Sequence, residues 1–393
     1  MQKYTADLIF TKDQKFECDK VIVTNDDGTI LTVDAVSDHD TASVKKLEGA
    51  LIPGFINTHC HLELSHMKNL VDTGTTLLPF LKSVVKHRDF KDEIIQSAIE
   101  AGDKEMFENG IVAVGDISNK TDTAFCKSKS KLVYYTFIEM FDFLSPAMTE
   151  ATIAQYLAVM QGMNSDSLNK KSYAPHAPYT VSKGLFQFIQ DNNPAHSTVS
   201  IHNQETAHED ELFRSGSGGF VDFFQSFGID TSHLQATGQS SIHYAMENID
   251  PRQKVLFVHN TMTDEDDIKA AQAWSEKVYW ATCPNANLYI ENRLPDYSKF
   301  LRHESKMTIG TDSLTSNWQL SIWEEIKTIH KYCSYVPIEN LITWATINGA
   351  KALGYDHIFG SFEVGKRPGL VNVPLMQIGN DWIILEGRVE RVL

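Results

Sequence analysis

Short apolar runs that end in polar, Gly or Pro residues recur along the chain from Leu51 onward. Each has the length of a buried strand, and most are followed by an amphipathic stretch typical of a helix. There are about eight of them, the number that closes a parallel (β/α)8 barrel. The runs lie at 51–61, 110–118, 132–140, 171–180, 198–205, 254–260, 278–287 and 307–313. The pattern therefore predicts a chain of repeated βα units.

Two amphipathic stretches represent the helices expected around this barrel. Residues 92–110 and 264–277 carry apolar side chains at helical spacing between charged ones. The first stretch ends at Gly110, and helices often end in a left-handed backbone conformation that glycine adopts freely. Both stretches are predicted to cover the outside of the sheet.

The two ends of the chain have a different pattern. Residues 1–50 alternate apolar and polar positions around a turn at 25–28, which predicts short antiparallel strands. The segment after Ala350 is again strand-like, with Gly and Pro between the runs. We predict a β-sandwich built from residues 1–52 and 353–393, attached to a barrel of residues 53–352.

Composition and charge narrow the function. The chain has 42% hydrophobic and 22% charged residues, as ordinary globular proteins do. Its formal net charge of -16 argues against nucleic-acid binding and favours a small neutral or cationic substrate. The five cysteines form no C-x-x-C pair, and neither a signal peptide nor a membrane-spanning apolar run is found. We expect a cytoplasmic protein without membrane contact. The sequence does not decide whether the protein forms a homo-oligomer.

Metal-binding residue types stand at the ends of several predicted strands. His59 and His61 end the first strand two residues apart, so strand alternation points both imidazoles the same way. His202, His259 and Asp312 follow apolar runs in the fifth, sixth and eighth strands. One such histidine alone is usually a hydrogen-bonded structural residue. Together, His59, His61, His202 and Asp312 predict a site for one divalent ion, Zn(II) or Fe(II), that can lower the pKa of a water to ~7.

Three residues are expected to move or hold protons. Glu205 lies three positions beyond His202, where the strand turns into its helix, and we assign it proton transfer to and from the substrate. A carboxylate that only stabilises the helix N-terminus is the alternative, and the two roles are compatible. Asp312 would accept a proton from water while His259 stabilises the developing charge, with capping and core hydrogen bonding as their alternatives.

Six motifs, in order along the chain, resemble those of the amidohydrolase superfamily. Within it, they are similar to the cytosine deaminase-like group, which contains adenosine-derivative deaminases and triazine chlorohydrolases. Six ordered motifs are far more specific than any one of them. The motifs are PGFINTHCHLE (53–63), PHAPYTVS (175–182), HNQET (202–206), TCPNANLYI (282–290), GTDS (310–313) and GSFEVGKRPG (360–369).

The resemblance implies a distorted (β/α)8 barrel beside a composite β-sandwich, with the ligand and acid-base roles given above. It also implies that His176 and the region from Asn285 to Asn287 hold polar groups of the substrate. His176 stands where binuclear relatives have a lysine, so one metal ion is expected. The closing motif reads KRPG where relatives have a basic residue followed by Ala-Asp, a departure that affects only the edge of the sandwich.

Two further carboxylates are candidates for substrate binding. The run from His59 to Ser65 resembles the H-x-H-x-E-x-S pattern of aminodeoxyfutalosine deaminases. Glu63 continues the alternation of the histidine pair, so it either faces the pocket and binds a ribose hydroxyl or forms a buried salt bridge. Glu139 ends the third strand and is a second candidate for the pocket wall.

The leading functional hypothesis is hydrolytic deamination of an amino-substituted heterocycle, such as an adenosine derivative. The enzymatic alternative is hydrolysis of a cyclic amide or a C–Cl bond, because the same kind of site supports several reactions. A different class of alternative is a catalytically silent barrel that serves as a binding or scaffold protein. Such a protein would be expected to lose a ligand or the acid, whereas here the whole set is present.

Overall fold

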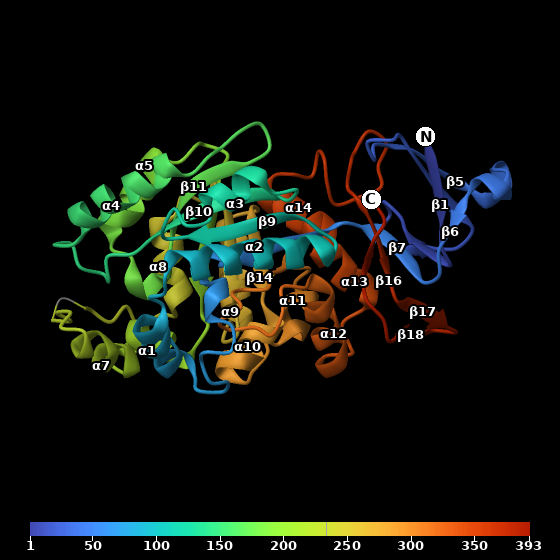
Figure 1. Cartoon of the computed structure of the whole chain (residues 1–393). Helices are drawn as coiled ribbons and strands as arrows, with labels where there is room; N and C mark the ends of the chain where they lie inside the picture. Colours follow the sequence, from blue (N-terminus) through green and yellow to red (C-terminus); the bar gives the residue numbers. More distant parts are fainter. Residues whose placement is uncertain (233) are drawn as a thin grey trace.

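The predicted alternation of strands and helices is present in the computed structural model, which describes residues 1–232 and 234–393 (Figure 1). Eight strands form two parallel four-stranded sheets, β8-β9-β10-β11 and β12-β13-β14-β15. Their bounds are β8 (Phe55–Cys60), β9 (Ile111–Ser118), β10 (Val133–Met140), β11 (Lys170–Pro175), β12 (Thr198–Asn203), β13 (Lys254–His259), β14 (Val278–Thr282) and β15 (Met307–Ile309).

Helices lie between successive strands and cover the sheets (Figure 1). The two predicted helices are confirmed as α2 and α9, and Gly110 has the left-handed φ of 77° expected after a helix end. The α-helices are α1 (Leu77–His87), α2 (Asp92–Glu108), α3 (Ala124–Lys129), α4 (Thr149–Gly162), α5 (Lys183–Asn192), α6 (Ala207–Ser215), α7 (Gly219–Ser226), α8 (Ser241–Asn248), α9 (Glu265–Trp274), α10 (Pro284–Glu291), α11 (Tyr297–Arg302), α12 (Ile322–Tyr332), α13 (Ile338–Thr343) and α14 (Gly349–Leu353).

Shorter helical turns follow some of the strands or join neighbouring helices. The short turns are η1 (Val36–Asp38), η2 (Thr41–Ser43), η3 (Leu62–Met67), η4 (Pro178–Thr180) and the π-helical η5 (Trp344–Asn348).

Among the described residues, no helix has the length and apolar character to cross a membrane.

Most of the predicted strands are shorter than their apolar runs, and three of the runs continue into another strand or a helix. The run at 51–61 is divided at Gly54, where a Cβ would lie 2.7 Å from the carbonyl oxygen of Pro368. Its first part belongs to β7 of another sheet, and only its second part is β8. The runs at 171–180 and 278–287 end in η4 and α10. Motif residues beyond these strands therefore lie on turns and at a helix start.

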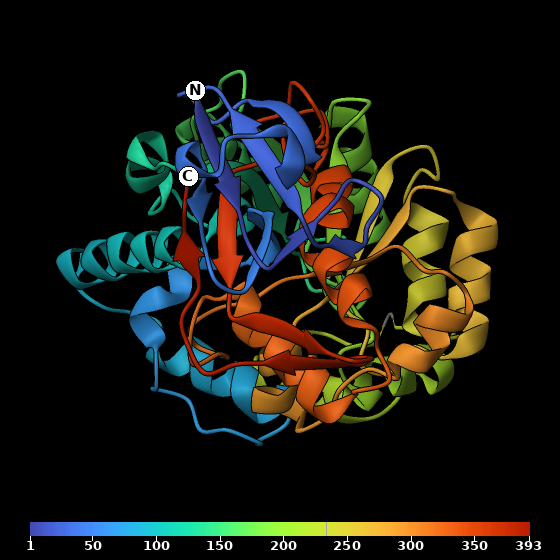
Figure 2. The same cartoon turned by 90° about the vertical axis from the view of Figure 1, so that its right-hand side faces the viewer.

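Both ends of the chain meet in a group of small sheets, where β7 pairs with β16 in antiparallel register (Figure 2). One sheet has the order β5-β4-β1-β6, another the order β19-β16-β7-β2-β3, and β17 and β18 form a hairpin. The strands are β1 (Gln2–Thr5), β2 (Leu8–Phe10), β3 (Phe16–Glu17), β4 (Lys20–Thr24), β5 (Ile30–Ala35), β6 (Lys45–Lys46), β7 (Ala50–Pro53), β16 (Leu370–Val373), β17 (Leu375–Ile378), β18 (Asp381–Ile384) and β19 (Glu390–Arg391).

Candidate active site

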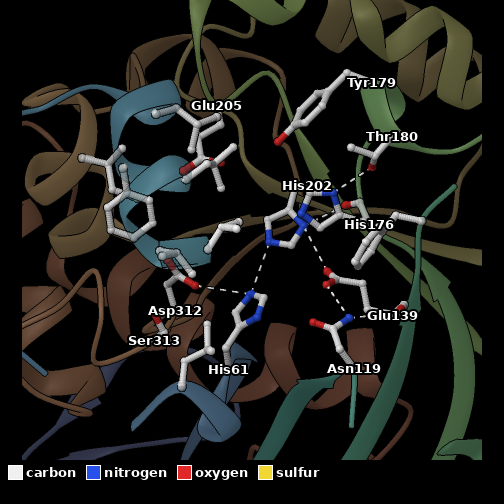
Figure 3. A pocket seen from close by; sticks show the side chains of 18 of the residues that line it. His61, Asn119, Glu139, His176, Tyr179, Thr180, His202, Glu205, Asp312 and Ser313 are labelled. Atoms are coloured by element: carbon white, nitrogen blue, oxygen red, sulfur yellow. Dashed lines mark hydrogen bonds and ion pairs between the residues drawn. The ribbon is translucent and has the colours of Figure 1, made fainter. Parts of the chain in front are cut away.

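A cavity of about 310 Å³ lies at the carboxyl ends of the parallel strands (Figure 3). Its inner end carries histidines and carboxylates, and its outer wall is apolar. The inner residues follow strands of both sheets, because parallel strands bring their carboxyl ends to one side. The polar residues that line it are His61, Arg88, Asn119, Glu139, His176, Thr180, His202, Glu205, His259, Asp312 and Ser313.

The four predicted metal ligands converge at the inner end. The Nε2 atom of His61 lies 3.1 Å from Nε2 of His59 and 3.3 Å from Nε2 of His202. The Oδ1 atom of Asp312 lies 3.4 Å from Nε2 of His61 and 3.7 Å from Nε2 of His59. Strand alternation explains why the first two imidazoles meet. The strand ends of the two sheets thus bring together residues from distant parts of the sequence.

These imidazoles have the protonation state that a metal requires. Burial lowers the pKa of His59, His61 and His202, so the rings are neutral at neutral pH. The Nδ1 atom of His202 lies 2.7 Å from the carbonyl oxygen of His176 and donates to it, which leaves a lone pair on Nε2. Three facing ring nitrogens and a carboxylate are a donor set that fits a divalent cation.

A second group of potential ligand atoms adjoins the first. It consists of Glu139, His176 and His202, so it shares one histidine with the cluster above. The Nδ1 atom of His202 lies 3.5 Å from Oε1 of Glu139, but its proton is directed to the His176 carbonyl. The geometry therefore favours one ion on the Nε2 side.

Glu205 lies on the other side of His202 from Glu139 (Figure 3). Its carboxyl group is buried, and burial raises its pKa well above the ordinary value, with the charge of Asp312 adding to the effect. Its Oε2 atom lies 3.7 Å from Nε2 of His259. A buried, protonated carboxyl at this position can act as a general acid.

Glu209 holds the backbone that carries this acid. Its carboxyl group, whose pKa burial raises to about 8, accepts hydrogen bonds from the backbone N–H of Gln204 at 3.0 Å and of Glu205 at 3.2 Å. Gln204 has a positive φ of 46°, a conformation that costs energy for a residue with a side chain. The carboxyl group of Glu209 thus stabilises a strained turn beside the cavity.

His259 is oriented by an amide from the next strand end. Its Nδ1 atom lies 2.9 Å from Oδ1 of Asn287 and donates to it, so the Nε2 atom faces the cavity. Burial lowers the pKa of His259. Both His259 and Asp312 have positive φ, at 72° and 57°. Strained conformations at two candidate catalytic positions are typical of sites whose geometry is set by the surrounding fold.

The two candidate carboxylates Glu63 and Glu139 differ in position. The alternation predicted for Glu63 does not hold, because η3 begins at Leu62 and ends the strand geometry. Glu63 accepts backbone hydrogen bonds from Asn119 and Lys120 at 2.9 and 3.1 Å, and Arg88 lies 3.9 Å away. Burial raises its pKa to about 7. It is absent from the residues that line the cavity, so the contacts fit the salt-bridge alternative.

Glu139 does line the cavity. Its Oε2 atom accepts a hydrogen bond from Nδ2 of Asn119 at 3.0 Å, and burial raises its pKa to about 8. His176 also lines the cavity, with Nδ1 2.8 Å from Oγ1 of Thr180. Burial lowers the pKa of His176 to about 3. Both groups are therefore uncharged at neutral pH and offer hydrogen bonds to a polar substrate.

The asparagines predicted from the seventh strand lie behind the cavity wall, not in its lining. Asn285 donates to Glu325 through its backbone N–H and its Nδ2 atom, at 2.8 and 2.9 Å. The side-chain oxygen of Asn287 accepts a hydrogen bond from His259. Their contacts position other residues of the site, because α10 begins at Pro284 and turns the asparagines away from the strand end.

The outer wall of the cavity is made mainly of side chains from α1 and α7. Phe80 from α1 and Phe223 from α7 are both largely buried. Further apolar residues of the wall come from the same two helices, from η3, from the segments after β10 and β11, and from α10. They are Leu64, Leu77, Leu81, Val84, Val85, Phe141, Phe143, Tyr179, Phe224 and Ile290.

The sequence analysis missed Asn119, Arg88 and Thr180. Asn119 directly follows β9, so the strand-end rule that found the histidines also applies to it. Thr180 lies within the PHAPYTVS motif. Arg88 caps α1, and only the folded chain brings it to the cavity and to Glu63.

Comparisons with known proteins place this site in context. The model of the amidohydrolase family matches residues 50–387. The chain is 28% identical to an adenosine deaminase from Helicobacter pylori over 81% of this chain and 78% of that protein. It is also 28% identical to an aminodeoxyfutalosine deaminase from Nitratiruptor sp., over 84% of this chain and 79% of that protein.

A solved structure has the same fold. It is the aminofutalosine deaminase of Helicobacter pylori in complex with methylthio-coformycin. The TM-score is 0.77 and the identity 24%, with 94% of this chain and 91% of that chain covered.

Proposed function

Because the chain belongs to the amidohydrolase family, we propose that it is a metal-dependent hydrolase that deaminates the adenine ring of an adenosine derivative. Deaminases of adenosine and of aminodeoxyfutalosine among its relatives support this substrate class. The observation that carries the proposal is the position of Glu205, a buried carboxyl group at the same cavity end as the three converging imidazoles. That pairing suits the addition of water to a ring carbon beside a ring nitrogen.

We propose that His59, His61, His202 and Asp312 hold one divalent ion, Zn(II) or Fe(II). The proposal is supported by their neutral ring nitrogens and by the carboxylate 3.4 Å from His61. When bound, such an ion supplies a nucleophile at neutral pH by acidifying water.

The residues of the chain then divide the proton transfers. Glu205, protonated before the reaction, gives its proton to the ring nitrogen of the substrate as water adds to the neighbouring carbon. As a carboxylate it accepts one proton from the water and delivers it to the departing amino group, which leaves as ammonia, and it takes back the second water proton as the ring carbonyl forms. Asp312 takes part in deprotonating the water, and His259 holds it through the lone pair on Nε2, which is left free by the bond to Asn287.

We propose that Glu139 and His176 contact the polar groups of the substrate. Both line the cavity, and both are uncharged at neutral pH. Glu63, Asn285 and Asn287 act on the substrate indirectly, through the groups that they hold in place. The apolar wall from α1 and α7 then covers the rest of the substrate and excludes water.

We also propose that the two parallel sheets form one distorted (β/α)8 barrel of residues 53–352. Backbone bonds at both junctions support this. The N–H of His202 on β12 donates to the carbonyl of His176 after β11, and the N–H of Asp312 after β15 donates to the carbonyl of His59 on β8. The small sheets would form the composite β-sandwich of residues 1–52 and 353–393.

Ammonia release from a panel of adenosine derivatives tests the proposed function. Protein stripped with a chelator and reloaded with zinc or iron should release one ammonia per substrate, and stripped protein should release none. The same panel should include several cyclic amides and a chlorotriazine. Ring opening or chloride release without any ammonia from the adenosine derivatives would overturn the deaminase proposal, and no turnover at all would favour the silent scaffold.

A further inference from the structure

A buried ion pair lies outside the cavity, on the first parallel sheet. Lys127 of α3 places its Nζ atom 2.6 Å from Oδ2 of Asp116 on β9. The exposed fractions are 8% for Lys127 and 0% for Asp116. Nζ also donates to Oγ of Ser118 at 3.1 Å and to Oγ1 of Thr136 at 3.0 Å. All three N–H groups of the ammonium are thus used, which is the condition for burying such a charge.

The other oxygen of Asp116 binds the backbone directly after the histidine pair. Its Oδ1 atom accepts a hydrogen bond of 2.8 Å from the backbone N–H of Leu62, which directly follows His61. The pairing of β8 with β9 is irregular between Asn57 and Cys60, so regular ladder bonds do not hold this end of β8. The carboxylate replaces the missing ladder bond where the strand passes into η3.

Stability alone does not account for a charge pair at this position. Replacing a buried ion pair by apolar side chains of similar volume is often neutral or stabilising, because both charges lose their hydration on burial. By contrast, groups that orient the ligands of a metal commonly set its affinity by ~10- to 100-fold. The contact with Leu62 is of the second kind, since it fixes the backbone next to a proposed ligand.

We propose that Asp116 is a positioning residue for His61. By fixing the N–H of Leu62, its carboxylate sets the imidazole of His61 in the orientation that the metal needs. The inference rests on the proposed ligand set, in which His61 binds the ion. Lys127 neutralises the buried charge of Asp116 and does not itself carry the positioning, so an uncharged side chain with the same oxygen can replace the pair.

Two double variants separate positioning from packing. D116L/K127M fills the space with apolar groups and removes the acceptor for Leu62. D116N/K127M also removes both charges but keeps a side-chain oxygen for Leu62. Zinc affinity, measured by competition with a chromophoric chelator, should fall ~10- to 100-fold in D116L/K127M and stay within about threefold of the wild type in D116N/K127M. The visible spectrum of cobalt-loaded protein should change only in D116L/K127M.

Unchanged zinc affinity in folded D116L/K127M would overturn the proposal. Should that variant fail to fold, D116N/K127M still decides, because a tenfold loss in this variant contradicts a role that depends on the Leu62 bond alone. The variant His61→Ala distinguishes the two proposals. If His61→Ala binds zinc as tightly as the wild type, the ligand set is wrong; if it loses zinc while D116L/K127M keeps it, only the positioning role is wrong.

Discussion

The inner end and the outer wall of the cavity are built in different ways. At the inner end, two of the imidazoles are fixed by a hydrogen bond from behind: His202 has the carbonyl of His176 as its partner, and His259 has Asn287. The outer wall consists mainly of apolar side chains from α1 and α7, which make nondirectional contacts. Directional bonds fix atoms to a fraction of an ångström, whereas apolar contacts tolerate adjustment. Changes at the inner end should therefore lower kcat, and changes in the wall should raise KM.

The largest effect is expected at the proposed ligands. Replacing His202 by Ala removes the Nε2 atom that lies 3.3 Å from Nε2 of His61. We expect loss of bound metal and of turnover by more than the ~10²- to 10⁴-fold that proton transfer contributes. Elemental analysis and ammonia release measure both. A variant that kept its metal and its kcat would contradict the proposed difference between the inner end and the outer wall of the cavity.

The next largest effect is expected for Glu205→Gln. The amide cannot give a proton to the ring nitrogen, so kcat should fall ~10²- to 10⁴-fold while metal content is unchanged. Glu211→Gln is the matched control, because it makes the same change on an exposed part of α6. Equal activity of the two variants would remove Glu205 from proton transfer.

A smaller loss is expected when the support of His259 is removed. Asn287→Ala leaves the Nδ1–H group of His259 buried without its acceptor, at a cost of ~1–3 kcal/mol. We expect kcat to fall ~5- to 150-fold with KM nearly constant. Asn192→Ala, on the exposed end of α5, is the control. A change confined to KM would instead indicate that Asn287 contacts the substrate.

Substitutions in the apolar wall should weaken substrate binding. Phe80→Ala in α1 and Phe223→Ala in α7 each remove apolar contacts, so KM should rise ~10-fold with kcat little changed, in line with ~1–3 kcal/mol for a lost apolar contact. Steady-state kinetics measures the split. Phe125→Ala, an exposed residue of α3, should change neither constant. A large fall in kcat for Phe80→Ala would show that the wall takes part in the chemistry.

The smallest effect lies outside both ends of the cavity. Hydrogen bonds from His303 and Arg302 lower the pKa of Glu265 to about 2 from its ordinary value of 4.5. Since the folded pKa is the lower one, the stabilisation is complete above about pH 4.5 and disappears as the pH falls toward 2. The Tm difference between wild type and Glu265→Gln should therefore shrink over this range, without any effect on turnover at neutral pH. A constant difference would contradict the role of the ionised carboxylate.

Much of the fold could be read from local pattern. The apolar runs located every strand of the two parallel sheets, because strands buried on both faces are almost continuously apolar. The ends of these runs were less certain. Gly54 divides one run between two sheets, at a point where a Cβ would lie 2.7 Å from the carbonyl oxygen of Pro368, a residue distant in sequence.

Local pattern likewise predicted only part of the candidate site. Alternation along β8 was enough to pair His59 with His61, but it failed one step later at Glu63, where η3 replaces the strand. The distinction between Asn287, which orients His259, and Asn285, which binds Glu325, depends on how α10 leaves the strand end. The residues around each asparagine in the sequence do not indicate which side chain it contacts.

The sequence by itself determined the strand–helix repeat, the strand-end residues His59, His61, His202 and Asp312, and Glu205 beyond them. These follow from hydrophobic periodicity and residue chemistry, both of which act over a few neighbouring positions. Tertiary structure alone decided which groups hold them. The bond from Leu62 to Asp116, the turn held by Glu209 and the wall from α1 and α7 depend on contacts between segments far apart in the chain. Buried polar groups must find partners wherever the fold brings them, and that requirement has no local pattern.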